Sequence, residues 1–234
     1  MHVFDARIAA ITPATPSIRA LRLAIPDTGF RFLPGQWVDL GIEIDGITHT
    51  SGYSIITSPV QRGEIELAVK ASARHPVARW VHECARVDDH VRVTQGQGPF
   101  VYLPEMSDNV VLIGGGVGVT PLLSIFRHVR DAGLSTCVHM VYSVSDSREI
   151  LFRDELETAA RRRDNLYVNI TVTQPDPCWK GLTGRIDPIM LHALGVPDDT
   201  LYYLCGPRGM VEDMSTLLHD LGVPMSRIIF EKWW

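Results

Sequence analysis

The sequence predicts two units of different fold class. The first is an antiparallel six-stranded β-barrel over residues 1–104, and the second is a doubly wound parallel α/β unit over residues 105–234. In the first part, short segments alternate apolar and polar residues, and Pro-Gly, Asp-Gly and Arg-Gly pairs separate them. In the second part, apolar strands alternate with amphipathic helices, which indicates βαβ units and a parallel sheet. The boundary is expected near 104–108, where Pro, Ser, Asp and Asn gather.

Composition narrows the class of protein. A hydrophobic fraction of 45% is ordinary for a globular protein, and a net charge of -5 without a basic block gives no support to nucleic-acid binding. No apolar run reaches membrane-spanning length, and residues 1–7 lack the apolar core of a signal peptide, so we expect a cytoplasmic protein without membrane contact. The 4 cysteines and 9 histidines show no metal-ligand spacing, so no metal site is expected.

The first half contains strand patterns, one helix and one hydroxyl-rich segment. Period-two alternation predicts strands over residues 17–25, 36–44, 64–70 and 90–94. A helix is predicted over 77–85, with Pro76 at its start, and a turn over 95–100. Around residues 50–59 a strand ends among hydroxyl side chains. Tyr53 could lay its ring on a planar cofactor and Ser54 could bond a ring nitrogen, although both also fit as ordinary strand residues.

A strand, a glycine cluster and a helix follow one another near the start of the second half. The strand is predicted over 110–113 and the helix over 121–131, with Thr120 as N-cap and Pro121 in the first helical position. Between them lie four glycines, at 114, 115, 116 and 118. Such a turn exposes backbone N–H groups and the positive end of a helix, so it is a candidate pyrophosphate cradle. Pro121 stands where G-x-G-x-x-G requires a third glycine, and a glycine turn without a ligand is the alternative.

The remaining elements continue the alternation. Strands are predicted over 136–142, 166–172, 201–204 and 227–231, and helices over 149–162 and over 207–221, the latter closed by Gly222. Ligands of open parallel sheets bind beyond the carboxyl ends of the strands. Cys205, at the end of a predicted buried strand, is therefore expected at a crevice, although a small buried hydrophobe is the alternative role.

Several motifs together resemble one superfamily. Gly35-Gln36, Tyr53-Ser54-x-x-x-Ser58-Pro59, Gly96-Gln-Gly-Pro-Phe100, the glycine cluster through Pro121, and Cys205-Gly-Pro207 with Met210 occur in the order typical of the ferredoxin–NADP reductase superfamily. Gly52-Tyr53-Ser54, His75-Pro76 and the ending Glu231-Lys-Trp-Trp234 are most similar to the oxidoreductase NAD-binding-domain-containing proteins. The resemblance covers nearly the whole chain.

The resemblance implies a flavin-dependent NAD(P)H oxidoreductase. Its cofactors would be FAD and NAD(P)H, with hydride passing from nicotinamide to FAD and electrons onward to a separate acceptor, either a protein or a small molecule. It implies catalytic roles for Ser54, Cys205 and Glu231. It also implies cofactor contacts at Tyr53, Ser54, Ser58, Val69, Lys70, Arg74, Pro76, Val77, Ala78, Gly115, Gly116, Val117, Gly118, Thr120, Pro121, Ser143, Asp146, Gly206, Pro207, Met210, Trp233 and Trp234.

Two departures from the superfamily pattern leave an alternative function open. Ser51 stands where an arginine usually pairs with a flavin phosphate, and the usual G-x-x-S helix start reads His75-Pro-Val-Ala78. Arg74 and Arg79 flank this helix and either compensate for the lost contacts or are solvated surface charges. The alternative is a nucleotide-binding regulatory or electron-transfer subunit with weak or absent flavin.

One turn, which contains Asp146 and Arg148, bears on the choice between NADH and NADPH. Asp146 favours a free ribose 2′-OH and Arg148 favours a 2′-phosphate. Members of this family often carry an arginine at the position of Ser145, and its absence tilts the expectation towards NADH. The acceptor, the direction of the reaction and the oligomeric state are not specified by any motif.

Overall fold

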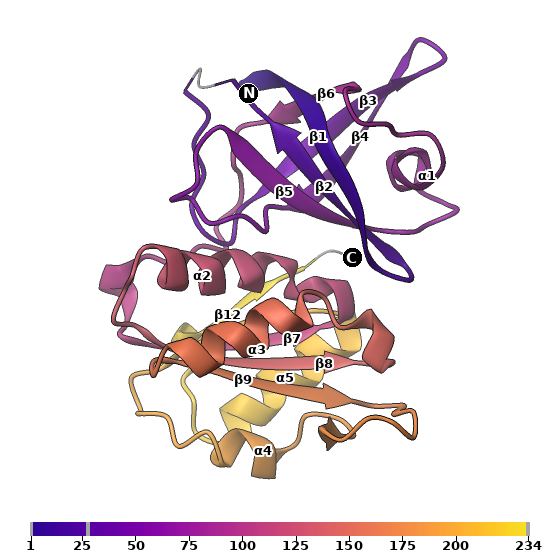
Figure 1. Ribbon diagram of the computed structural model, residues 1–234. Coiled ribbons are helices and arrows are strands. Elements are labelled where there is room, and N and C mark those ends of the chain that lie inside the picture. Colours follow the sequence, from indigo (N-terminus) through magenta and orange to yellow (C-terminus); the bar gives the residue numbers. More distant parts are fainter. Residues whose placement is uncertain (1, 27–28, 233–234) are drawn as a thin grey trace.

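The N-terminal half is a closed antiparallel barrel (Figure 1). The computed structural model describes residues 2–26 and 29–232. The 6 strands of the first sheet lie in the order β4-β3-β6-β1-β2-β5, and each neighbouring pair is antiparallel. A bridge between Ile55 and Leu67 joins the chain after β4 to β5, so the two edges of the sheet meet. The strands are β1 (Val3–Thr15), β2 (Ile18–Ala24), β3 (Trp37–Ile44), β4 (Ile47–Ser54), β5 (Glu64–Lys70) and β6 (His90–Thr94).

One helix, α1 (Pro76–Glu83), packs on the barrel. Its apolar side chains Val77, Ala78 and Val81 join the barrel core. The His82 ring bonds the carbonyl of Val69 in β5 at 2.8 Å, which fastens the helix to that strand.

The C-terminal half is a parallel sheet with helices on both faces, as the doubly wound class requires. Its 6 strands lie in the order β10-β9-β8-β7-β11-β12. Helices α2 and α3 cover the face nearer the barrel, and α4 and α5 cover the other face (Figure 1). The elements are β7 (Asn109–Gly115), α2 (Thr120–Asp131), β8 (Cys137–Val144), α3 (Arg153–Arg162), β9 (Leu166–Val172), β10 (Leu182–Thr183), α4 (Pro188–His192), β11 (Leu201–Cys205), α5 (Arg208–Asp220) and β12 (Ile228–Glu231). None of the described helices is long and apolar enough to cross a membrane.

The predicted fold class is confirmed, but strand β1 was missed by the sequence patterns. Its first part alternates buried and exposed residues, and then register shifts at Ile8/Ala10 and Pro13/Thr15 break the alternation. Pro13 lies at one of these irregularities, where a residue without an N–H group is tolerated in a sheet. The short elements β10 and α4 carry too few residues to show a period.

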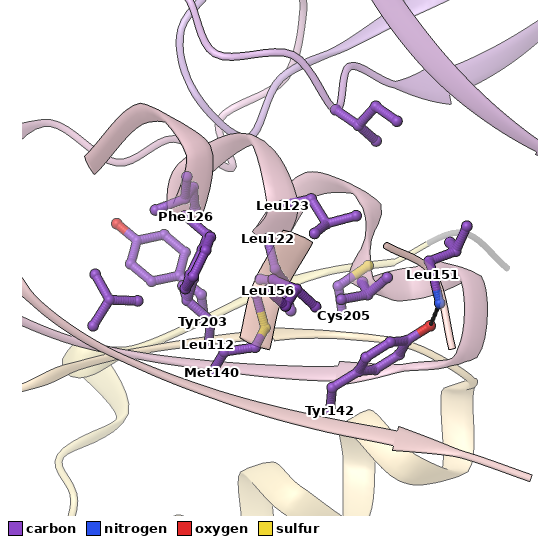
Figure 2. Packing of buried hydrophobic residues seen from close by; sticks show 14 of the residues in the cluster. Leu112, Leu122, Leu123, Phe126, Met140, Tyr142, Leu151, Leu156, Tyr203 and Cys205 are labelled. Atoms are coloured by element: carbon purple, nitrogen blue, oxygen red, sulfur yellow. Dashed lines mark hydrogen bonds between the residues drawn. The ribbon is translucent and has the colours of Figure 1, made fainter. Parts of the chain in front are cut away.

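The prediction of a helix over 149–162 was wrong at its start. The helix begins at Arg153, and Phe152 before it adopts a left-handed backbone with φ 54°. The chain is held in another conformation there, because Glu149 accepts hydrogen bonds from Thr15 and Ser17 of the barrel at 2.8 and 2.6 Å. The N–H of Leu151 donates to the Tyr142 hydroxyl at 3.4 Å, and Leu151 is fully buried (Figure 2).

The two halves share one apolar cluster. Barrel residues Ile56, Ala68 and Phe100 belong to the same cluster as the core between the parallel sheet and helices α2 and α3. The Tyr203 hydroxyl of β11 donates to the carbonyl of Val101 at 2.8 Å. The barrel is therefore packed against the parallel sheet in one defined orientation.

Candidate functional site

Two turns meet where the strand order of the parallel sheet reverses. From β7 the chain moves outward to β8, β9 and β10, and it then returns to β11 on the other side of β7. Ligands of such sheets bind at this switch point, beyond the carboxyl ends of the strands. Gly114 of β7 pairs with Cys205 of β11, so the turns Gly116–Val119 and 206–207 leave the sheet side by side.

Two glycines at the first turn, Gly115 and Gly118, allow the turns to touch. A Cβ atom on Gly118 would lie 2.5 Å from the Cα of Gly206, and one on Gly115 would overlap the sulfur of Met210. Gly116 differs, because its φ is +53° and nothing lies within 4 Å of its Cβ position. Packing between the turns therefore accounts for Gly115 and Gly118, whereas Gly116 leaves open space beside the backbone.

The predicted N-cap role of Thr120 was wrong. Val119 occupies the cap position with helical backbone angles, and Thr120 is the first residue of α2. The Thr120 hydroxyl donates to the carbonyl of Val117 at 2.9 Å, which stabilises the preceding tight turn. Pro121 lies in the first turn of the helix, as predicted.

A cavity of about 550 Å³ lies between these turns and the barrel. Small-molecule sites commonly have volumes in this range. Residues of both halves line it, and Tyr53 and Cys205 are among them. The other lining residues are Ser51, Gly52, Ser54, Ala68, Lys70, Ala71, Ser72, His75, Ala78, Gly115, Gly116, Val117, Gly118, Thr120, Gly206, Pro207 and Arg208.

The charge of the lining has one sign. Lys70 and Arg208 are cations, and no Asp or Glu belongs to the described lining residues. The chain as a whole carries a net charge of -5. A cavity with this lining favours a polyanionic ligand such as a dinucleotide.

The end of β4 carries the tyrosine that was predicted to face a planar cofactor. Tyr53 is half-buried and packs against the barrel core, and burial raises the pKa of its hydroxyl. A hydrogen bond with Ser51 opposes this shift, so Ser51 contributes to holding the ring. Ser54 is buried and also lines the cavity.

The start of α1 faces the same cavity. His75 holds the cap position without a side-chain hydrogen bond to the helix, and His75 and Ala78 both line the cavity. The first turn of the helix has no capping side chain, so its backbone N–H groups are available to an anion. Arg74 and Arg79 are exposed and lie outside the lining.

Some predicted site residues do not line the cavity. Val69 and Val77 belong to the barrel core, and Ser58 is buried, with its hydroxyl oxygen accepting from the N–H of Val60 at 3.3 Å. The others outside the lining are Arg74, Pro76, Pro121, Ser143, Asp146, Met210 and Glu231. Trp233 and Trp234 lie outside the described residues. Sequence reasoning missed Gly52, Ala68, Ala71, Ser72 and Arg208, although Ala71 and Ser72 directly follow Lys70 and Arg208 follows Pro207.

Asp146 and Arg148 neutralise one another in the turn after β8. The Asp146 carboxylate accepts from the backbone N–H of Arg148 at 2.9 Å and from its guanidinium at 2.5 Å. These hydrogen bonds lower the pKa of Asp146 to about 2. The carboxylate that favours a free ribose 2′-OH and the arginine that favours a 2′-phosphate are therefore bound to one another in one exposed ion pair.

Glu231 is the acidic group closest in the sheet to the crevice. It pairs in register with Cys205, so the two side chains project from the same face of neighbouring parallel strands. Its Oε2 atom is buried, and no described residue hydrogen-bonds to it. Burial raises the pKa of Glu231 to about 7. Cys205 itself is 1% exposed and belongs to the apolar cluster beneath α2 (Figure 2).

Fold and cavity together define the class of protein. An antiparallel barrel and a parallel nucleotide-type sheet that share one cavity are the architecture of ferredoxin–NADP reductase-like proteins. The chain has this fold, and it superposes with a TM-score of 0.85 on a ferredoxin NADP+ reductase from Neisseria gonorrhoeae with bound FAD and NADP, at 22% identity over 100% of both chains. Among the described residues no three His, Cys, Asp or Glu side chains group so as to hold a metal ion.

Sequence comparison then identifies the family. The chain belongs to the oxidoreductase NAD-binding-domain-containing proteins: the Danio rerio oxidoreductase NAD-binding domain-containing protein 1 is 38% identical over 255 residues, covering 100% of this chain and 93% of the relative. An oxidoreductase FAD-binding domain matches residues 5–102 and an oxidoreductase NAD-binding domain matches residues 112–216. FAD and NAD(P)H are therefore its cofactors. The reductase component of propane 2-monooxygenase from Rhodococcus jostii is 30% identical over 97% of this chain and 62% of that protein.

The contact between the two turns predicts the effect of a single methyl group. Gly118→Ala is expected to lower the free energy of unfolding by about 1–3 kcal/mol, because the added Cβ meets backbone that cannot rotate away. Urea unfolding measures the change. Gly209→Ala is the control: nothing lies within 4 Å of its Cβ position, and a gain of about 0.5–1 kcal/mol is expected from helix propensity. Equal effects of the two substitutions would contradict the packing role of Gly118.

The raised pKa of Glu231 predicts a pH-dependent stability. In the folded state the pKa of the Glu231 carboxyl is about 7, whereas its ordinary value is 4.5. The contribution of the protonated carboxyl to stability is therefore fully present below the unfolded pKa and is lost as the pH rises through the folded one. Glu231→Gln removes the charge, and we expect a melting temperature above that of the unsubstituted protein at pH 8 and equal to it at pH 4. Glu212→Gln, in an exposed pair with Arg208, is the control and is expected to show no such pH-dependent gain. A gain for Glu231→Gln of the same size at both pH values would refute the assignment.

Proposed function

We propose that this protein transfers hydride from NADH to FAD and passes the electrons to a separate acceptor. The observation that carries the proposal is the shared cavity: the Tyr53 end of the barrel and the Cys205 end of the parallel sheet line one hollow. Two planar ring systems can meet there only because the two halves face one another across it. Hydride transfer depends above all on such close positioning.

The residues of the cavity fit two dinucleotides. Gly116 leaves open space beside its backbone, the start of α1 offers uncapped N–H groups, and the described lining contains Lys70 and Arg208 but no carboxylate. Pyrophosphate groups require such donors and cations. We assign the barrel side, around Tyr53 and His75, to FAD and the side around Gly116 and Pro207 to the nicotinamide dinucleotide.

Bound flavin supplies the ability to take up two electrons and release them, and the protein supplies binding and alignment. Tyr53 presents a flat ring, and Ser54 presents a hydroxyl next to it. Cys205 gives the crevice a small, weakly polar wall. Glu231 can hold a proton close to that wall at neutral pH, because its carboxyl is buried without a described partner.

The acceptor is proposed to be a separate molecule. One relative is named as the reductase component of a monooxygenase, which places that protein in an assembly with an electron-consuming partner. By analogy, we infer that this chain delivers electrons to a protein or small molecule outside the 234 residues of the sequence. The changes at Ser51, His75 and Ala78 favour a second candidate, a nucleotide-binding subunit that has lost stable flavin.

Flavin loading and reduction test the proposal. After addition of FAD and removal of the excess, we expect a yellow protein. Mixing it with NADH under anaerobic conditions should bleach the flavin absorbance. A flavin-loaded protein that neither NADH nor NADPH bleaches would refute hydride transfer. A colourless protein that does not take up FAD but binds NADH in a titration would support the second candidate.

The pairing of Asp146 with Arg148 predicts a change of dinucleotide preference. NADH is expected to reduce the flavin more efficiently than NADPH, because Asp146 disfavours a 2′-phosphate and occupies the guanidinium of Arg148. Asp146→Ala frees Arg148 and removes the negative charge, so we expect the NADPH-to-NADH efficiency ratio to rise about tenfold. Stopped-flow reduction measures both. Asp146→Ala/Arg148→Ala is the control and should lose most of the gain; an unchanged ratio in the single variant would contradict this role.

A further inference from the structure

One face of helix α2 connects the cavity to the barrel. Thr120, Ser124 and Arg127 are spaced four and three residues apart, so they share a face of the helix. Thr120 lines the cavity. Ser124 is fully buried, and its hydroxyl donates to the carbonyl of Thr57 in the barrel at 2.9 Å. Helix α2 begins directly after the turn Gly116–Val119, which we call the nucleotide turn, and is therefore bonded to the barrel along the same face.

Arg127 makes the central contact of this face. Its side chain is only 9% exposed. On the barrel side, its Nη1 atom donates to the carbonyl of Ile56 and to the carboxylate of Glu66, each at 3.0 Å. On the other side, Nε and Nη2 donate to the two oxygens of Glu155 in α3 at 2.9 and 2.6 Å. The guanidinium also lies over the Phe152 ring, 4.6 Å from its centroid.

The barrel contacts of Arg127 are adjacent in sequence to the cavity lining. Ile56 lies two residues after Ser54, and Glu66 lies two residues before Ala68. These two segments are bonded to one another, since the N–H of Ile56 donates to the carbonyl of Glu66 at 2.9 Å. Arg127 thus holds both barrel segments close to where each enters the cavity.

The geometry points to a positioning role for Arg127: we propose that it fixes the barrel wall of the cavity relative to the nucleotide turn, and thereby sets the approach of the two cofactor rings. The inference rests on the proposed function. Burial opposes the charge of Arg127, but its bonds and ion pairs to Glu155 and Glu66 outweigh burial and raise its pKa, so the guanidinium stays charged. A planar, fork-shaped guanidinium donates in fixed directions to four acceptor atoms from three residues, whereas an ammonium group has three donors on a flexible stem.

Replacing Arg127 should slow reduction without weakening cofactor binding. In Arg127→Met we expect the limiting rate of flavin reduction at saturating NADH to fall about ten- to a hundredfold, the range caused by small misplacements of reacting groups. The FAD dissociation constant and the half-saturating NADH concentration should change by less than about twofold, because Arg127 lines neither binding region. Arg127→Lys should recover part of the rate.

Arg130→Met is the matched control. Arg130 lies one turn further along α2 and also binds Glu155, at 2.5 Å, but its other side-chain partner is Asp131, so it makes no described hydrogen bond to the barrel. This variant loses the same charge and an ion pair to the same carboxylate. We expect a limiting rate within about twofold of the unsubstituted protein. An equal loss of rate in both variants, or an unchanged rate in a folded Arg127→Met, would overturn the proposal.

Hydrogen exchange of the cofactor-free protein provides a second test. Arg127→Met should accelerate amide exchange in residues 55–57 and 120–127 more than Arg130→Met does, because only Arg127→Met removes the hydrogen bonds from α2 to Ile56 and Glu66 of the barrel. If Arg127→Met does not fold, Glu66→Gln replaces it and should show several-fold slower reduction and faster exchange at 55–57. An unchanged reduction rate and unchanged amide exchange in Glu66→Gln would then refute the positioning role of Arg127. Flavin that NADH fails to bleach in the unsubstituted protein would refute the proposed function alone, since the exchange comparison is independent of it.

Discussion

The contact between helix α2 and the barrel is the constraint on which the site depends. Neither half forms the cavity alone: the β4 end of the barrel supplies one side, and the turns after β7 and β11 supply the other. The apolar part of the contact, which includes Ile56 and Ala68, holds the halves together through non-directional burial. Directional bonds from Ser124 and Arg127 contribute to the orientation, together with those of Tyr203 and Glu149 to the barrel.

A buried arginine contributes little to the free energy of unfolding, but it specifies the geometry of the groups around it. Removing a guanidinium from water costs several kcal/mol, and its ion pairs roughly recover that cost when every donor is placed well. A small rotation of the barrel would leave the Glu66 carboxylate and the Ile56 carbonyl without this donor. The same bonds that contribute little net stability therefore disfavour every other arrangement of the two halves.

The sequence could predict the parts of the site that depend on local rules. Strand, glycine turn and helix around Gly116 follow from period and composition, and the motif order around Tyr53 and Cys205 indicated which segments converge. The roles of Gly115 and Gly118 could not be predicted, because their neighbours Met210 and Gly206 lie about ninety residues away in sequence. The role of Arg127 could not be predicted either. On a predicted amphipathic helix an arginine looks like a solvated surface charge, and only the fold brings Glu66, Ile56 and Glu155 around it.

The position of Glu231 explains how a carboxyl group can border a site for polyanions. Dinucleotides carry several negative charges, and the described lining contains the cations Lys70 and Arg208 and no acidic residue. An ionised Glu231 beside Cys205 would repel these ligands in a medium that screens charge poorly. Because the group is buried without a described partner, its pKa rises to about 7 and much of it is neutral at neutral pH. In the proposed function, burial of this carboxyl would keep a proton close to the crevice and would also remove a charge that repels a dinucleotide.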